Sequence, residues 1–261
     1  MKIAQIVCTF PPYRGGIGNS AYNFAKIISS QGYEVTTFTP TAKQLREKDK
    51  KLNSIGKIVK LKPWLKYGNG AFMPQLFFRL KKYDLIFFHY PFFGTAEVIW
   101  FYKIFYPKKK LIIHYHMDVI QTNFLTKMLS LTNRLIRNSL FNKANIITCA
   151  SLDYIKHSQI AKFYYKNPEK FKEIPFGVDT HKFSPLPVKK QGAIYPLCQG
   201  EKINMLPHLN KGGQGGVILF VGGLDQAHYF KGVNILLKAV AELKIKNWQL
   251  NIAGDGNLKT S

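Results

Sequence analysis

The chain has 261 residues, of which 46% are hydrophobic and 20% are charged. That composition can bury a substantial core and excludes disorder as the default state. Lysine and arginine number 38 against 14 acidic residues, a formal net charge of +24, so the charge predicts an anionic partner: nucleic acid, anionic lipid or a phosphorylated metabolite.

The first residues and the cysteines both indicate a cytoplasmic protein. The apolar part of the N-terminus breaks at Pro11 and Pro12, too soon for a signal peptide. Cys8, Cys149 and Cys198 are odd in number, far apart and match no zinc or redox spacing. We expect structural thiols in a reducing compartment.

Strand-like runs alternate with helical stretches along most of the chain, a rhythm typical of βα units and a parallel sheet. The runs cover residues 2–8, 33–39, 83–90, 110–117, 144–150 and 170–176. The first helix follows the first run, with Asn19 or Ser20 as its cap and Gly32 at its end. Gly15 and Gly16 then stand just before a helix N-terminus.

The segment Leu85–Tyr102 is apolar enough to suggest a membrane span. His89, Pro91, Gly94 and Glu97 interrupt it. A buried strand, a turn and an amphipathic helix therefore explain the segment better than a span does.

The pattern lapses after Pro185. Residues 186–216 are typical of an interdomain connection extended by a flexible insertion. A second βα rhythm follows, with a strand at 217–221, a helix from about 231 to 243 and a strand at 249–253. The chain then ends at Ser261, after what amounts to half a domain.

The loop FPPYRGGIGNS, residues 10–20, feeds bare backbone N–H groups into a helix N-terminus, a combination suited to a phosphate. An NAD site is disfavoured, because the second strand ends TTFTP without the acidic residue that binds ribose, and because the glycine order differs from that fingerprint. Taken alone, the loop is as consistent with a structural turn as with a ligand site.

Four segments carry a specific resemblance: PPYRGGIGNSAYNFAKIISSQGYEVTTFTP, IPFGVDTHKFSP, LFVGGLDQAHYFKGVNILLKA and NIAGDGNL. In this order the chain resembles the GT-B glycosyltransferases of family 4, retaining enzymes that use nucleotide-sugar donors. The resemblance implies an α/β fold of GT-B type. It further implies a complete N-terminal Rossmann-like, acceptor-side domain over 1–185, a linker or insertion over 186–216, and a partial C-terminal nucleotide-sugar-binding domain over 217–261.

The resemblance also implies site residues. Gly15 and Gly16 match the glycine loop that approaches the donor diphosphate across the cleft between the two domains, where a Cβ at Gly16 would obstruct it. Lys231, in the KG motif, would bind the same diphosphate, although a solvated lysine at a helix start is the alternative. His116 matches the histidine that faces the transferred sugar, with a role in positioning and electrostatic stabilisation.

Further positions of the second domain are candidates for donor contact, namely Gly223, Asp225 and Gly254. The family often has an arginine where this chain has Gly223, so half of the usual cationic pair is in doubt. Asp179 and Asp255 also match cleft positions, but Gly and Asp favour turns for conformational reasons alone.

A metal site is the rival interpretation of the histidines. His114, His116 and Asp118 have the His-x-His-x-Asp spacing of binuclear metallohydrolases, but Val119 stands where a further histidine is expected. The chain has no Asp-x-Asp pair of the kind that clamps a metal in GT-A transferases. The resemblance implies metal-independent, front-face transfer in which the departing diphosphate accepts the acceptor's proton, with no cofactor beyond the nucleotide sugar.

Basic and aromatic residues interleave on parts of the chain. Nine basic residues lie between Lys43 and Lys66, and the runs FFRLKKY and FYKIFYPKKK add more. This pattern suits an anionic membrane surface, while solvated helix faces are the plain alternative and no nucleic-acid motif is present. The resemblance implies a glycolipid or polyprenyl-linked acceptor, in polysaccharide or lipopolysaccharide assembly at the inner face of the cell membrane.

The resemblance places a paired-glutamate donor motif beyond GDGNL, outside the chain. We therefore expect the chain to be part of an active glycosyltransferase. The alternative is a catalytically impaired protein that retains anion and membrane binding through its first domain.

Overall fold

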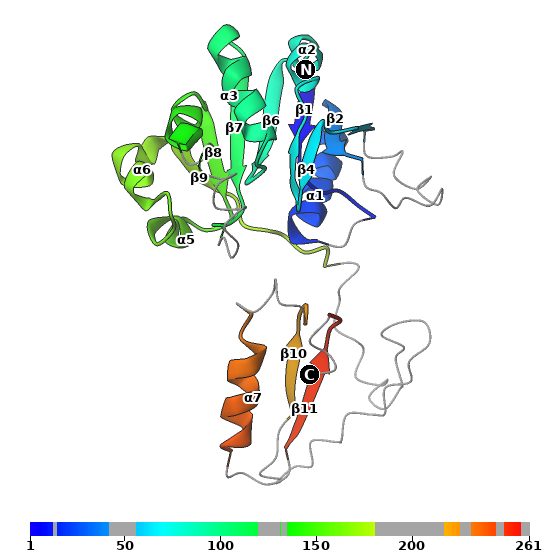
Figure 1. The fold of residues 1–261 in the computed structure, drawn as a ribbon, viewed down its shortest axis with the longest axis vertical. Coiled ribbons are helices and arrows are strands. Elements are labelled where there is room, and N and C mark those ends of the chain that lie inside the picture. The colour runs from blue at the N-terminus through cyan, green and yellow to red at the C-terminus, as the bar shows by residue number, and fades with distance from the viewer. Residues whose placement is uncertain are drawn as a thin grey trace. The chain divides into compact units, whose positions relative to one another are not determined.

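The computed structural model divides into two units, Met1–Asp179 and Thr180–Ser261, and each is treated separately below (Figure 1). It describes residues 1–12, 15–41, 56–119, 131, 135–180, 217–224, 231–243 and 248–256. The predicted linker over 186–216 lies outside the described residues, as do Cys198 and Asp225.

The first unit is built on a seven-stranded sheet in the order β3-β2-β1-β6-β7-β8-β9, with every neighbouring pair parallel. The strands are β1 (Lys2–Ile6), β2 (Glu34–Pro40), β3 (Lys57–Leu61), β6 (Leu85–Tyr90), β7 (Lys110–Tyr115), β8 (Ile146–Cys149) and β9 (Phe171–Glu173). The six predicted strands are confirmed, and β3 is an additional strand at the edge of the sheet. A small antiparallel hairpin, β4 (Leu65–Tyr67) and β5 (Gly70–Phe72), follows β3 in the chain.

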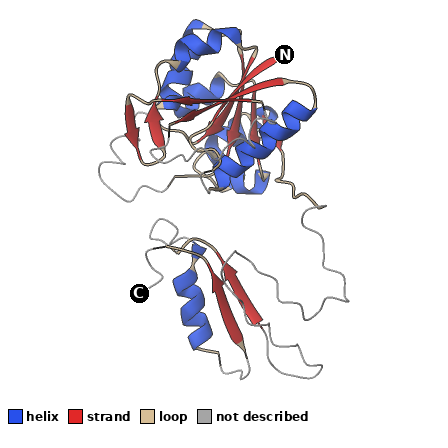
Figure 2. Ribbon diagram, turned by 90° about the vertical axis from the view of Figure 1, so that its right-hand side faces the viewer, coloured by secondary structure: helices blue, strands red, loops and turns tan. Residues whose placement is uncertain are grey.

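Helices lie on both faces of this sheet (Figure 2). They are α1 (Gly16–Ser30), α2 (Leu76–Arg79), α3 (Thr95–Phe105), α5 (Leu152–Lys156) and α6 (Ala161–Lys166), with 3₁₀ turns η2 (Leu80–Lys82) and η3 (Pro168–Lys170) and a helical stretch at 135–142. The strand, turn and helix predicted over 85–102 are confirmed as β6 and α3. In the part of the chain that is described, no helix has both the length and the apolar character needed to cross a bilayer.

Strand alternation gives the two faces of β6 different chemistry. Phe88 and Tyr90 belong to the large hydrophobic cluster that also contains the buried apolar residues of α2 and α3. Phe87 and His89 point to the other face, where the ring of Phe24 from α1 lies 5.4 Å from Phe87 and 6.0 Å from His89. Side chains of a strand alternate between faces, so α1 covers the face of the sheet that carries His89.

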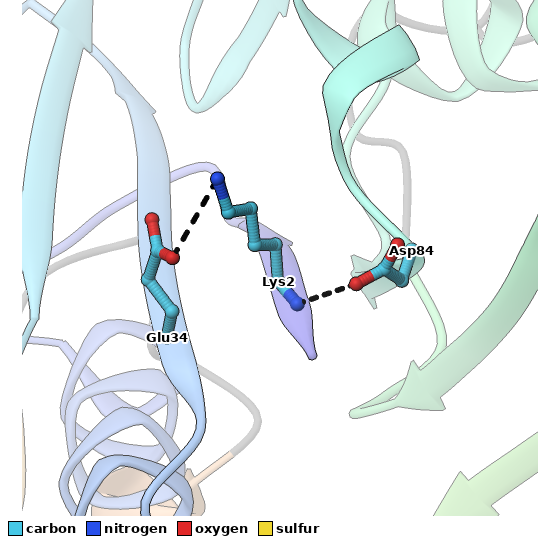
Figure 3. A network of polar contacts seen from close by, with 3 residues as sticks. All are labelled: Lys2, Glu34 and Asp84. Carbon is cyan, nitrogen blue, oxygen red and sulfur yellow. Dashed lines mark hydrogen bonds and ion pairs between the residues drawn. The ribbon is translucent and has the colours of Figure 1, made fainter.

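The amino-terminal end of β1 is tied to its neighbours through Lys2 (Figure 3). The backbone N–H of Lys2 donates to the carboxylate of Asp84 at 2.7 Å, and the Lys2 ammonium lies 3.9 Å from Glu34. The ion pair is exposed and contributes little. The hydrogen bond from the Lys2 backbone joins the amino-terminal ends of β1 and β6. These ends lie at the side of the sheet opposite to the carboxyl ends, where the candidate site lies.

The second unit contains β10 (Val217–Val221), α7 (Val233–Ala241) and β11 (Gln249–Ala253). The two strands are parallel, with Val217 opposite Gln249 and Val221 opposite Ala253. Both strands and the helix agree with the sequence prediction. This is a β-α-β unit, in which the helix connects two adjacent parallel strands.

Candidate active site

The glycine loop leads into α1 earlier than predicted. Gly16 is the first residue of the helix and Gly15 is its N-cap, so the cap predicted at Asn19 or Ser20 was wrong. In the described part of the chain no side chain caps the helix, and no acidic residue lies in its first turn. The first backbone N–H groups of a helix have no intrahelical acceptor. This N-terminus therefore presents uncapped donors and the positive end of the helix dipole.

Gly16 and Gly18, both in this first turn, differ in whether packing requires a glycine. A Cβ at Gly18 would lie 3.0 Å from the backbone oxygen of Thr9, so close packing of the helix on the preceding loop requires Gly18. A Cβ at Gly16 would meet nothing within 4 Å. Packing within the described protein therefore explains Gly18 but not Gly16.

His116 lies directly after β7, at the carboxyl edge of the sheet. Its backbone N–H donates to Tyr90 at 2.9 Å, which extends the pairing with β6 by one residue. The carboxyl ends of parallel strands lie at one edge, so the loop from β1 to Gly16 and the end of β7 share this edge. The imidazole is half-buried and stacks on the ring of Phe176.

A row of hydrogen-bonded polar side chains crosses the sheet beneath His116. The hydroxyl of Thr37 donates to Oε1 of Gln5 at 3.1 Å. The amide nitrogen of Gln5 lies 2.8 Å from both the Ala21 carbonyl oxygen and Nε2 of His89. Nδ1 of His89 lies 2.8 Å from Nε2 of His116. The row connects strands β2, β1, β6 and β7 to the start of the candidate site.

His114 completes the cluster on the same face. Its Nδ1 lies 2.8 Å from the hydroxyl of Thr148, and its buried Nε2 has no hydrogen-bond partner among the described residues. Phe24 contacts the ring from α1, and the rings of His114 and His116 lie 4.5 Å apart. His114 and His116 therefore lie on the same face of the sheet, as expected for residues two apart on a strand.

Sequence reasoning missed Gln5 and His89. Strand register brings them in: Gln5 lies opposite Phe87, and His89 lies opposite His114. Because β1 and β6 are neighbours although 84 residues separate the two side chains, no local spacing links them. The available signal was polarity, since each is a polar residue within an otherwise apolar buried strand.

The three imidazoles are neutral. Burial, with a contribution from nearby His114, lowers the pKa of His116 to about 3. Burial lowers the pKa of His114 to about 4. Burial, with His116 and His114 adding to it, lowers the pKa of His89 well below its ordinary value. At neutral pH each ring is therefore uncharged and can both donate and accept one hydrogen bond.

These pKa shifts predict a loss of stability in acid. At these three positions the unfolded chain gains protons below about pH 6.5 while the folded chain does not, so the free energy of unfolding falls as the pH drops from 6.5 toward 4. Each neutral histidine contributes about 1.4 kcal/mol per pH unit over that window. Urea unfolding at a series of pH values measures the slope, and His114→Phe should make it shallower. An unfolding free energy that stays constant from about pH 7 to about pH 5 would contradict the assignment of neutral rings.

The structure does not bring together the ligands that the rival metal interpretation requires. Asp118 turns away from the imidazoles, accepting a hydrogen bond from the Tyr115 hydroxyl and two at 3.1 Å from the backbone N–H of Gln159. The ring of His114 bonds to Thr148. Across the described ranges, no group of three or more His, Cys, Asp or Glu side chains is arranged to hold a metal ion.

The two described cysteines are buried thiols. Cys8 and Cys149 are both free. Burial raises the pKa of each thiol to about 11, with Glu173 adding to the effect at Cys149. Such thiols are unreactive at neutral pH, which agrees with the structural role predicted for them.

In the second unit, Lys231 lies immediately before α7. Gly232 follows as the N-cap, with φ of +73°, a conformation that favours glycine. The Lys231 side chain is exposed and passes over the end of β10, where a Cβ at Gly222 would meet its Cδ at 3.0 Å. Lys231 therefore lies where the carboxyl end of β10 adjoins the N-terminus of α7.

The neighbouring turn is packed backbone against backbone. A Cβ at Gly254 would lie 2.0 Å from the carbonyl oxygen of Gly222, and the N–H of Leu224 donates to Asp255 at 2.9 Å. Gly254 therefore has a structural reason to be glycine. Gly223 lies in the same turn, and Asp179 lies at the end of the first unit.

Comparison with protein families identifies the chain's relatives. The family model described as Glycosyltransferase Family 4 matches residues 14–182, which is more than half of the chain. The chain belongs to this glycosyltransferase family. A search of curated proteins found no match.

Solved structures of glycosyltransferases share the fold of this chain. Sucrose-phosphate synthase from Thermosynechococcus elongatus matches with a TM-score of 0.63 and 18% identity, over 96% of this chain and 61% of that one. The catalytic domain of starch synthase IV from Arabidopsis thaliana, bound to ADP and acarbose, gives 0.60 and 13%, over 98% and 69%. Anabaena HepE in complex with UDP-glucose gives 0.56 and 16%, over 98% and 61%.

The family 4 chain has the GT-B fold, with a Rossmann-like N-terminal domain and part of a C-terminal one. It spans 61% of the length of the sucrose-phosphate synthase and 69% of the starch synthase domain.

Proposed function

We propose that this family 4 glycosyltransferase moves a sugar, with retention of its anomeric configuration, from a nucleotide-sugar donor to a lipid-linked glycan acceptor. The observation that carries the proposal is the neutral His116, held at the carboxyl edge of the sheet that also carries the uncapped glycine start of α1. A helix end that favours anions can bind the diphosphate in such a transfer, and a hydrogen-bonding imidazole can stabilise and position the sugar.

The donor diphosphate is assigned to Gly15 and Gly16 in the first unit. Uncapped N–H groups and the helix dipole favour phosphate oxygens, and the absence of a Cβ at Gly16 lets them approach the backbone. Lys231, in the second unit, is likewise proposed to bind donor phosphate, where its exposed ammonium can stabilise leaving-group charge. HepE with UDP-glucose and starch synthase IV with ADP support a nucleotide-linked donor. Gly223, Asp225 and Gly254 remain candidates for further donor contact.

His116 is assigned to the sugar. In front-face transfer the bond from the anomeric carbon to the diphosphate oxygen breaks, and the acceptor oxygen bonds to the same face of that carbon. The acceptor's proton passes to the departing diphosphate, so no protein base is required. A neutral imidazole then acts by hydrogen bonding and by positioning the sugar. Helix dipole and lysine replace a metal ion, so we propose transfer without a divalent cation.

The lipid-linked acceptor is supported by an aromatic and basic surface on α2, η2 and α3, formed by Phe78, Arg79, Lys81, Phe101 and Phe105. The three phenylalanines are 71%, 48% and 58% exposed. The Lys81 ammonium lies 5.9 Å from the centre of the Phe78 ring. Exposed aromatic rings beside cations suit the interface of an anionic bilayer. We propose that this surface holds the protein at the inner face of the cell membrane.

Membrane binding through this surface is tested by Phe78→Ser, Phe101→Ser and Phe105→Ser combined. We expect the triple variant to bind vesicles containing anionic phospholipid at least about tenfold more weakly than the original protein, because three rings no longer enter the interface. Co-sedimentation with vesicles measures the binding. Tyr165→Ser is the matched control, since Tyr165 is 65% exposed on α6. Equal binding by the triple variant would show that these faces are merely solvated.

Sugar transfer is tested on the full-length gene product with a panel of UDP-, GDP- and ADP-linked sugars and a membrane lipid extract as the acceptor source. We expect one donor to release its nucleoside diphosphate only when the lipid extract is present, without added divalent metal. Nucleotide and vesicle binding without acceptor-dependent release would instead favour the alternative, a binding protein that lacks turnover.

A further inference from the structure

The side chain of Gln5 has one orientation that satisfies its neighbours. It is fully buried on β1, and its amide lies 2.8 Å from the carbonyl oxygen of Ala21 in α1. A carbonyl oxygen can only accept a hydrogen bond, so the Gln5 atom facing Ala21 must be the amide nitrogen. The Thr37 hydroxyl donates to the other end, Oε1. Gln5 is therefore fixed with its nitrogen toward α1 and β6.

The fixed amide determines which nitrogen of His89 carries the proton. The Gln5 nitrogen also lies 2.8 Å from Nε2 of His89. An amide nitrogen has two hydrogens and accepts none, so it donates one to Ala21 and one to His89. Nε2 of His89 is then unprotonated. Because the buried ring is neutral, its single proton sits on Nδ1.

The same reasoning extends to His116. Nδ1–H of His89 donates across 2.8 Å to Nε2 of His116, so that nitrogen is an acceptor and the ring proton of His116 sits on Nδ1. Moving the proton to Nε2 would reverse both imidazoles and turn Oε1 of Gln5 against the Ala21 carbonyl. Within the described ranges, Nδ1 of His116 has no hydrogen-bond partner, so its N–H is available to a ligand.

We propose that Gln5 and His89 are positioning residues that fix His116 as an Nδ1-protonated imidazole, whose N–H donates a hydrogen bond to a substrate oxygen. A histidine held in this way is a hydrogen-bond donor and not a general base at the nitrogen it presents. This agrees with a transfer in which the departing diphosphate takes the proton. The naming of a substrate oxygen rests on the proposed sugar transfer, whereas the tautomer follows from the protein alone.

The tautomer is measured by long-range ¹H–¹⁵N correlation of the histidine rings in the 261-residue chain without any ligand, with His116→Asn used for assignment. In the original protein we expect protonated Nδ1 and unprotonated Nε2 in both His89 and His116. Gln5→Glu should reverse both rings. An ionised glutamate has no hydrogen to donate, and the one hydrogen of a protonated glutamate is taken by Ala21. His89 must then donate from Nε2 and accept at Nδ1 from His116.

Thr37→Val is the matched control, because it removes the hydroxyl on Oε1 and leaves both contacts of the amide nitrogen. It should keep the original tautomers. A proton on Nε2 of His116 in the original protein, a rapid average of two forms, or an unreversed Gln5→Glu overturns the proposal. If Gln5→Glu does not fold, His89→Phe replaces it, and a retained preference for Nδ1 in His116 then overturns the proposal. The spectrum needs no turnover, so its failure is distinct from failure of sugar transfer.

Discussion

In the full-length gene product, His116→Ala is expected to lower the rate of sugar transfer at least about tenfold while nucleotide binding changes little. The imidazole is assigned to the sugar and not to the diphosphate, so its loss should remove stabilisation that is present mainly in the transition state. Initial rates with the preferred donor and the lipid acceptor measure the effect. Nucleoside diphosphate binding is measured in parallel by calorimetry.

His157→Ala is the control for this variant, because His157 is exposed at the end of α5. It should transfer sugar at the original rate. Equal rates for His116→Ala and the original protein would remove His116 from the site. An equal loss in both variants would indicate a general effect of histidine replacement.

Gly16→Ala is expected to weaken nucleoside diphosphate binding at least about tenfold without destabilising the protein. An added Cβ meets no protein atom within 4 Å, and alanine is the better helix former, so the fold should be equally or slightly more stable. The same methyl group would stand between the helix N–H groups and a phosphate. Calorimetric titration with UDP, GDP and ADP measures the affinity, and thermal unfolding measures the stability.

Gly18→Ala is expected to give the opposite pattern. Its Cβ would press on the Thr9 backbone at 3.0 Å, so the variant should lose roughly 1 kcal/mol of stability. Any loss of nucleotide affinity should be smaller than that of Gly16→Ala. If Gly16→Ala binds nucleotides as well as the original protein, the glycine start of α1 is not the diphosphate site.

Elements with a clean local pattern could be predicted from the sequence. The strand of β6, the turn after it and α3 follow from an apolar run interrupted at His89, Pro91 and Gly94. In the second unit, β10 and β11 agree with their predicted bounds, and α7 begins two residues later than predicted because Gly232 is its N-cap. The period of the apolar residues and the turn-forming residues are enough to predict an element where no other signal competes with them.

Elements without a local signal could not be predicted. The predicted start of α1 was too late. Asn19 and Ser20 are residues of the types that usually cap a helix, but the actual N-cap is Gly15, which has no side chain. The strand β3 lies in a lysine-rich stretch, where charge obscured its alternation. An edge strand can carry such charges, and they protect it from pairing with other chains.

The candidate site was predictable only in part. Its glycines and His116 could be singled out along the sequence, but the row from Gln5 through His89 depends on the order of strands in the sheet. Without that order, His114, His116 and Asp118 suggested a metal, whereas the fold turns Asp118 toward Gln159. Side chains far apart in sequence become neighbours through register, which spacing alone does not encode.

The stereochemistry of the new glycosidic bond tests the central claim most directly. An α-linked, ¹³C-labelled nucleotide sugar would be incubated with the full-length gene product and lipid acceptors, and the one-bond carbon–hydrogen coupling at the anomeric carbon of the extracted lipid would be measured by NMR. We predict a labelled lipid product with an α linkage, as retaining transfer requires. A β-linked product, or no labelled lipid from any donor that the protein binds, would contradict the proposed function.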